Sequence, residues 1–169
     1  RLHRVSSYDP INLIKDYLGR VEYYQTQGRP DRALANLQAM ADAWFSSSRQ
    51  IYGRGGEQIP ELTQTIDLQY GPEIRLLGYS WQDTGSMSTE LVLYWQKLGE
   101  QTEAVYQPFV RLMNANGAVV WEGAPADPLP AKYIPADYVF YDQLLIEWEN
   151  RPARPLLLWL EITFPIENV

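Results

Sequence analysis

The chain has 169 residues, of which 46% are hydrophobic and 21% charged, and its formal net charge at pH 7 is −7. This length suits one ordinary core, or a domain of about 100 residues with a smaller companion, and the composition argues against wholesale disorder. Cysteine is absent and His3 is the single histidine, which excludes disulfides, thiolate or multi-histidine metal sites and an internal Ser-His-Asp triad. We therefore expect no catalytic residues, no metal and no cofactor.

The charge is distributed unevenly along the chain. Residues 1–62 hold eight Lys/Arg against seven Asp/Glu, whereas residues 63–169 hold six against fourteen. An acidic module repels phosphate backbones and anionic lipid headgroups, and no run approaches the roughly 18 apolar residues that span a bilayer. We expect neither nucleic-acid binding nor direct membrane insertion.

Two helices are predicted first. An Asp-Pro pair at residues 9–10 is a good helix start, because Asp caps free N–H groups and Pro is preset for the first helical position. Apolar residues then recur at three- and four-residue spacing until Gly28, which supplies a stop. A second helix follows, and its apolar face ends at Trp44 and Phe45. The pattern predicts an antiparallel helical hairpin over about residues 9–47.

This hairpin resembles a tetratricopeptide (TPR) unit. The residues that fall at the characteristic positions of that family are Tyr17, Val21, Tyr24, Gly28, Ala33 and Leu37, and GRPDRAL resembles its inter-helix turn. The match covers one repeat of about 34 residues, with Arg20 and Met40 as departures. A single repeat cannot bury both of its faces, so further repeats precede it or the pair packs on the rest of the chain. A generic helical hairpin stays open as the alternative.

After a predicted linker at 51–61, strand-like runs arrive at short spacing. They are 62–70, 74–82, 89–97, 104–113, 118–122, 138–148 and 156–164. Seven short strands separated by Gly, Pro, Asn and Ser in about 100 residues are typical of a two-sheet antiparallel sandwich. The predicted fold class is α+β, with a TPR-like hairpin (1–50), the linker (51–61) and a seven- to eight-stranded Ig-like or jelly-roll β-sandwich (62–169).

Three local patterns make this prediction specific. Asn116-Gly117 lies between two apolar runs within 109–122 and predicts a β-hairpin. Alternation over 138–148 places large apolar residues on one face, with Asp142 as the exception on that face. The run 156–160 is continuously apolar, which favours a strand covered on both sides.

A second resemblance covers roughly half of the chain. Its motifs are IRLLGYSW (74–81), LVLYWQ (91–96), FVRLMNANGAVVWEG (109–123) and YIPADYVFYDQLLI (133–146). These resemble a β-sandwich module at the C-terminus of bacterial membrane glycosyltransferases similar to the dolichyl-phosphate-mannose protein mannosyltransferases. Tyr133 replaces the usual Trp of that pattern and Ala136 the usual Gly.

The resemblance implies a non-catalytic accessory role in a larger membrane-anchored envelope protein. The chain begins with Arg, and we expect it to be a piece of such a protein, located on the periplasmic or cell-surface side. The TPR resemblance alone would also suit a cytoplasmic protein.

Two functions are carried forward. The first is a structural or protein-interaction role, with a protein partner or the rest of the parent chain, in which Trp44 and Phe45 offer an apolar contact. The alternative is carbohydrate binding, in which an exposed aromatic ring stacks on a sugar beside polar groups. The candidate rings for stacking are Trp81, Trp121, Tyr133, Tyr138 and Tyr141.

Overall fold

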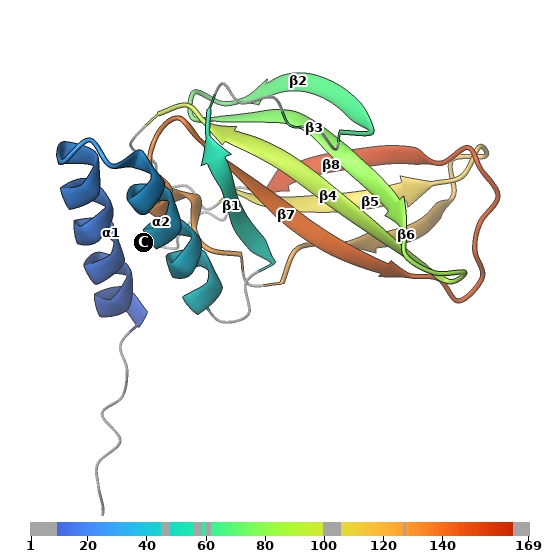
Figure 1. The fold of residues 1–169 in the computed structure, drawn as a ribbon. Coiled ribbons are helices and arrows are strands. Elements are labelled where there is room, and N and C mark those ends of the chain that lie inside the picture. The colour runs from blue at the N-terminus through green and yellow to red at the C-terminus, as the bar shows by residue number, and fades with distance from the viewer. Residues whose placement is uncertain are drawn as a thin grey trace, which may run out of the picture.

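Two helices precede a β-sandwich in the chain (Figure 1). The computed structural model describes residues 10–44, 48–55, 59, 62–99, 106–126 and 128–163. The helices are α1 (Pro10–Thr26) and α2 (Pro30–Ala43), and a short 3-10 helix, η1, covers Ala131–Tyr133. The strands are β1 (Arg49–Arg54), β2 (Gln64–Tyr70), β3 (Ile74–Asp83), β4 (Ser88–Lys97), β5 (Gln107–Met113), β6 (Val119–Gly123), β7 (Tyr138–Glu147) and β8 (Leu157–Thr163).

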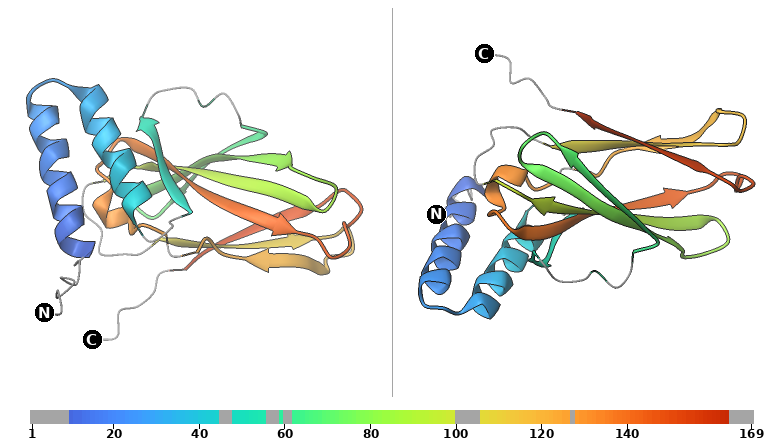
Figure 2. Two further views of the ribbon diagram at one scale, coloured as in Figure 1. Left: turned by 60° about the horizontal axis from the view of Figure 1, so that its bottom comes forward. Right: turned by 90° about the horizontal axis from the view of Figure 1, so that it is seen from above.

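The strands form two antiparallel sheets that lie as separate layers (Figure 2). The larger sheet has the order β1-β7-β4-β3-β2 and the smaller sheet the order β6-β5-β8. Side chains alternate between the two faces of each strand, and the inner faces meet in a core that contains Leu93, Trp95, Leu112, Phe140 and Ile146. The predicted α+β sandwich is confirmed.

All seven predicted strands are present in the structure. Their ends differ by small shifts where the structure describes them, and residues 104–105 and 164 lie outside the described residues. The hairpin of β5 and β6 turns at 114–118, where Gly117 has a φ of 78°. The side chain of Asn114 accepts the backbone N–H groups of Asn116 and Ala118, both at 3.0 Å. These bonds fix the turn locally, which is why its sequence predicts it well.

The predicted linker is wrong at its start, because residues 51–54 belong to β1. Ile51 is buried in the core, and Arg49 is fully buried on the same inner face. Arg49 Nε and Nη2 donate to the two carboxylate oxygens of Asp142 on β7, at 2.8 and 3.0 Å. The same guanidinium donates to the carbonyl oxygens of Leu129 and Tyr106. This ion pair attaches β1 to the sheet and explains the acidic exception in the alternation of β7.

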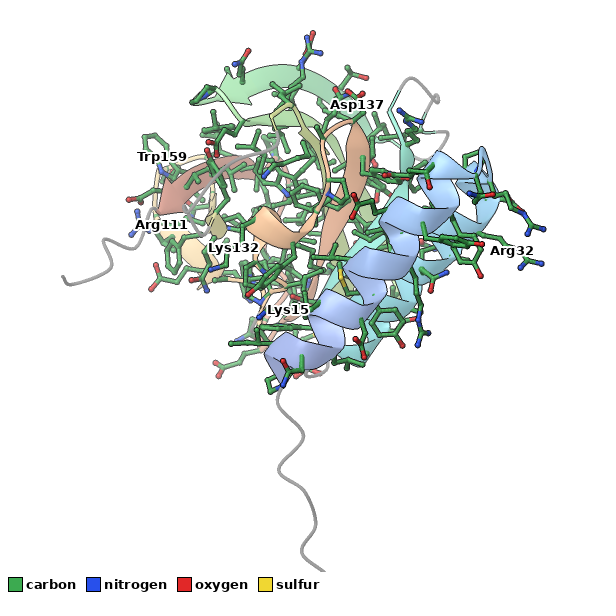
Figure 3. The ribbon with its side chains drawn as sticks, turned by 90° about the vertical axis from the view of Figure 1, so that its left-hand side faces the viewer. Lys15, Arg32, Arg111, Lys132, Asp137 and Trp159 are labelled. Carbon is green, nitrogen blue, oxygen red and sulfur yellow. The ribbon has the colours of Figure 1, made fainter. Side chains whose placement is uncertain are left out.

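The helical pair packs at one end of the sandwich, beside β1 (Figure 1). Buried residues of α1 and α2 belong to the same apolar cluster as the sandwich core; they include Ile14, Val21, Leu37 and Met40. Figure 3 views this end directly, with the helices in front of the sheets. The pair therefore buries its apolar face against the sandwich.

The expectation that 156–160 is covered on both sides is wrong. Leu157 and Trp159 are 60% and 53% exposed, whereas Leu158 and Leu160 are half-buried. Trp159 and Arg111 point outward from the smaller sheet (Figure 3). The strand is therefore covered on its inner face only, because the helices pack at the end of the sandwich, beside β1 of the other sheet.

Candidate functional site

A concave pocket lies on the outer face of the larger sheet. Strands β7, β4 and β3 are neighbours there, so their outward-facing residues form adjacent columns. Tyr141 is opposite Tyr94, Gln143 is opposite Val92, and Gln82 is opposite Glu90. The residues that line the pocket, whose volume is about 220 Å³, are Tyr52, Ser80, Gln82, Glu90, Val92, Tyr94, Tyr141 and Gln143.

Three tyrosines form the aromatic end of this pocket. The rings of Tyr52 and Tyr94 meet edge to face, with centroids 5.9 Å apart, and those of Tyr94 and Tyr141 lie 5.7 Å apart at a 40° tilt. Tyr94 is almost fully buried, whereas Tyr52 and Tyr141 are half-buried. The neighbouring rings restrain one another, so the exposed part of Tyr141 is presented in a fixed orientation.

Polar side chains form the other end. Gln82 and Gln143 are exposed, Ser80 and Glu90 are half-buried, and the Gln143 amide donates to the Glu90 carboxylate. Among the described lining residues Glu90 is the single charged group. The pocket therefore offers amide and hydroxyl donors and acceptors beside an aromatic surface, without a cation for a phosphate or a carboxylate.

A one-residue bulge in β3 decides which of its side chains reach this pocket. The register of β3 against β4 shifts between Leu76 and Gly78. Beyond the bulge, Ser80 and Gln82 face outward and Trp81 faces inward, opposite Leu91. A regular strand would have placed Trp81 outside, because a shift of one residue exchanges the two faces.

The structure separates the five predicted stacking rings. Tyr141 alone among them lines the outer pocket. Trp81 lines a different pocket between the sheets, and Trp121 is half-buried on β6. Tyr133 is half-buried and lies 6.2 Å from the ring of Trp44. Tyr138 is 2% exposed within the core, so its place among the stacking residues is wrong, because a sugar cannot reach its ring.

The apolar contact surface predicted on the helices is also partly buried within the chain. Trp44 is half-buried and packs against the core cluster beside Tyr133. Phe45 lies outside the described residues. The part of this contact that the structure describes is therefore packed within the chain.

Several residues of the pocket were missed by reasoning from the sequence. Tyr52 lay in the predicted linker, and Gln82, Glu90 and Gln143 are polar residues with no motif. The available signal was their alternation with core residues, since Glu90 and Gln143 each lie between two inward-facing positions.

The described residues add two further observations. No helix among them is long and apolar enough to cross a membrane. They also contain no group of three or more His, Cys, Asp or Glu side chains placed to hold a metal ion.

Comparisons with known proteins give little more. No family model and no curated protein matches the chain. One solved structure, the Streptococcus agalactiae AgI/II polypeptide BspA variable (V) domain, matches at 9% identity over 67% of this chain and 80% of that chain. Its TM-score is 0.26, which is too low to support an argument about fold or function. The candidate site therefore depends on its own geometry.

Proposed function

We propose that this chain is a non-catalytic module that binds a neutral glycan on the outer face of its larger sheet. The observation that carries the proposal is the placement of the Tyr141 ring beside the Gln143 amide in one pocket. Alternate residues of a strand lie roughly 7 Å apart, a span that one hexose with its hydroxyl groups can bridge. Ligand sites of this kind combine an apolar surface with a few placed polar groups.

The polar groups favour a neutral ligand. Gln82, Gln143 and Ser80 donate and accept hydrogen bonds, and the Glu90 carboxylate accepts them, as vicinal sugar hydroxyls require. A uronic acid or a phosphorylated sugar would instead bring a negative charge toward Glu90 in a chain of net charge −7. Glycoside hydrolysis generally uses two carboxyl groups, and Glu90 is the one carboxylate among the described lining residues.

The setting that fits such a module is a larger envelope protein. The resemblance of the sequence motifs to the C-terminal module of membrane glycosyltransferases supports an accessory role on the extracytoplasmic side. In that role the pocket would hold a glycan acceptor or product near a catalytic domain elsewhere in the parent chain. The helical pair would serve as the connection to that chain.

A protein-interaction role is the second candidate, and the exposed apolar side chains of β8 favour it. Leu157 and Trp159 are both exposed, and Trp159 points outward from the smaller sheet (Figure 3). Sedimentation of wild type and Trp159→Ser at several concentrations tests self-association through this face. A monomer at every concentration would remove that form of the interaction role.

The glycan proposal is tested by calorimetry with a panel of neutral oligosaccharides. Tyr141→Leu removes the ring but keeps apolar packing, and Gln143→Ala removes an exposed amide, so each should weaken binding severalfold while the fold persists. Tyr23→Leu is the matched control, because Tyr23 is 59% exposed on α1, away from the pocket. A folded wild-type protein that binds no member of the panel would refute the proposal, as would equal losses in all three variants.

A further inference from the structure

A second pocket opens at the side of the sandwich, where the two sheets are unequal in width. β2 is the edge of the larger sheet and β8 the edge of the smaller one. Leu68 of β2 is paired with Leu76, which faces inward, yet Leu68 is 49% exposed. The smaller sheet therefore does not extend over β2, and the inner face of β3 is accessible from the side.

The walls of this pocket are apolar and come from both sheets. Tyr79 and Trp81 of β3 face Leu112 of β5, Leu158 of β8 and Leu156, which directly precedes β8. The volume of the pocket is about 190 Å³. An apolar cavity of about 150 Å³ in another protein accommodates benzene. The space is thus sufficient for one ring or a short acyl chain.

The polar groups at the mouth are mainly donors. Thr63 Oγ1 accepts the backbone N–H of Trp81 at 2.9 Å, which leaves the hydroxyl hydrogen to be donated. The Arg154 guanidinium lies over the Trp81 ring, 5.9 Å from its centroid, and is 59% exposed. The Nε1 atom of Trp81 is buried, and none of the described residues accepts a hydrogen bond from it.

The charges at this mouth do not cancel. Arg154 Nη2 donates to Asp83 Oδ2 at 2.8 Å, and Arg151 pairs with the same carboxylate. Two guanidiniums share one carboxylate, so this cluster carries a net positive charge in a chain of net charge −7. A ligand with an apolar body and one anionic group complements both the walls and the mouth.

We propose that this side pocket binds a small monocarboxylic acid, with its apolar body between Trp81 and Leu158 and its carboxylate at Arg154. The site is separate from the glycan pocket, which lies on the opposite face of β3. A carboxylate fits better than a phosphate, because one charge suffices to balance the cluster. The proposal is independent of the glycan function.

The test compares octanoate with octanamide, which has the same chain length without the charge. Octanoate should bind severalfold more tightly by calorimetry, since its carboxylate forms an ion pair with the exposed Arg154 guanidinium and the neutral amide does not. Methyl NMR signals of Leu112, Leu156 and Leu158 should shift on its addition. Equal affinities, no octanoate binding, or shifts confined to other residues would overturn the proposal.

Variants locate the two ends of the ligand. Arg154→Gln should lower octanoate affinity severalfold and octanamide affinity much less, because only octanoate loses an ion pair. The exposed position of Arg154 keeps the fold intact. Arg111→Gln is the matched control, because Arg111 also pairs with carboxylates at an exposed position but on the outer face of the smaller sheet. Leu158→Trp should fill the pocket and abolish binding. Octanoate affinity that is unchanged in Arg154→Gln would contradict the assignment.

A peptide that ends in leucine combines an apolar group with a carboxylate, as a small acid does, and must be tested in a separate experiment. An acetylated tripeptide with a C-terminal leucine carries an apolar side chain next to a carboxylate. Weaker binding of the tripeptide than of octanoate supports the small-acid assignment. Tighter binding of the tripeptide would overturn it in favour of a protein C-terminus.

Discussion

At the scale of single residues, the buried pair of Arg49 and Asp142 has the largest expected energetic consequence. Both side chains are at most 1% exposed, and Arg49 also lies over the ring of Phe140, 4.8 Å from its centroid. Four hydrogen bonds to carboxylate and carbonyl oxygens satisfy the guanidinium. Breaking a buried pair on one side leaves an uncompensated charge, whereas replacing both partners does not.

We therefore expect Arg49→Met to lower the free energy of unfolding by about 3–5 kcal/mol. The double variant Arg49→Met/Asp142→Leu should recover much of that loss, because it removes both buried charges. Urea denaturation of the wild type and the variants gives the comparison. A loss of less than about 1 kcal/mol in the single variant would mean that the pair does not hold β1 in place.

Asp83 connects the end of β3 to the segment that follows β7. Partial burial raises the pKa of this carboxyl, but the hydrogen bond from Thr89 and the charges of Arg151 and Arg154 outweigh burial and lower it below the usual 3.8. A lowered pKa in the folded state stabilises the fold above the pKa of the unfolded chain. That contribution is lost as the pH falls through the folded-state value.

The difference in stability between wild type and Asp83→Asn should therefore become smaller as the pH falls. The urea midpoint of the variant should lie below that of the wild type near neutral pH. The two midpoints should converge below the usual carboxyl pKa, where Asp83 of the wild type becomes protonated. A difference that is constant over this range would show that the charge of Asp83 does not act on stability.

At the scale of elements, the effect of a Gly→Ala substitution on stability can be compared between Gly117 in a turn and Gly19 in a helix. Space for a Cβ is open at both glycines, but Gly117 has a φ of 78° and Gly19 lies within α1. Gly117→Ala should destabilise the fold by about 1 kcal/mol because an L side chain disfavours positive φ. Gly19→Ala should stabilise it by roughly 0.5–1 kcal/mol through helix propensity. Thermal unfolding of both variants measures the difference, and equal effects would contradict the role of φ.

Elements defined by local signals could be predicted from the sequence. Both helices and the seven strands after residue 61 follow from periodicity and turn residues. β1 could not be predicted from the sequence, because its inward-facing Arg49 is stabilised by a carboxylate 93 positions away. A charged residue predicts an exposed position unless its buried partner is known.

The candidate site was less accessible than the fold. The residue type alone does not identify a stacking ring, because an aromatic side chain can bind a ligand only from the accessible face of its sheet. The bulge between Leu76 and Gly78 turns Trp81 inward and Gln82 outward. Gly78 is the local signal for it, because a glycine inside a strand often marks a bulge. Tyr141 is a predicted stacking ring that does line the pocket, but its polar neighbours come from three strands, β3, β4 and β7, whose alignment the sequence does not specify.

At the scale of the whole molecule, helices and sandwich share one apolar cluster. Leu37 of α2 is fully buried in that cluster together with Trp95 of β4. The predicted division at 1–50 and 62–169 is thus open to a direct test. A shared core should make both parts unfold together.

Leu37→Ala should lower stability by about 2–5 kcal/mol through loss of buried volume. The loss should appear equally in far-UV circular dichroism, which is dominated by the helices, and in tryptophan fluorescence, to which the sandwich contributes most of the tryptophans. Coincident denaturation curves are expected for wild type and variant alike. An early transition seen by circular dichroism alone would identify the helical pair as an independent unit.

The central claim, a neutral glycan on the outer face of the larger sheet, is tested most directly by mapping bound ligand with amide NMR spectra. Titration with an oligosaccharide that binds should shift the side-chain amide signals of Gln82 and Gln143 and the backbone signals around Tyr141. The amide signals of α1 and of the outer face of β8 should not shift. Shifts concentrated at β8 or at the helices, with Gln82 and Gln143 unchanged, would contradict the account.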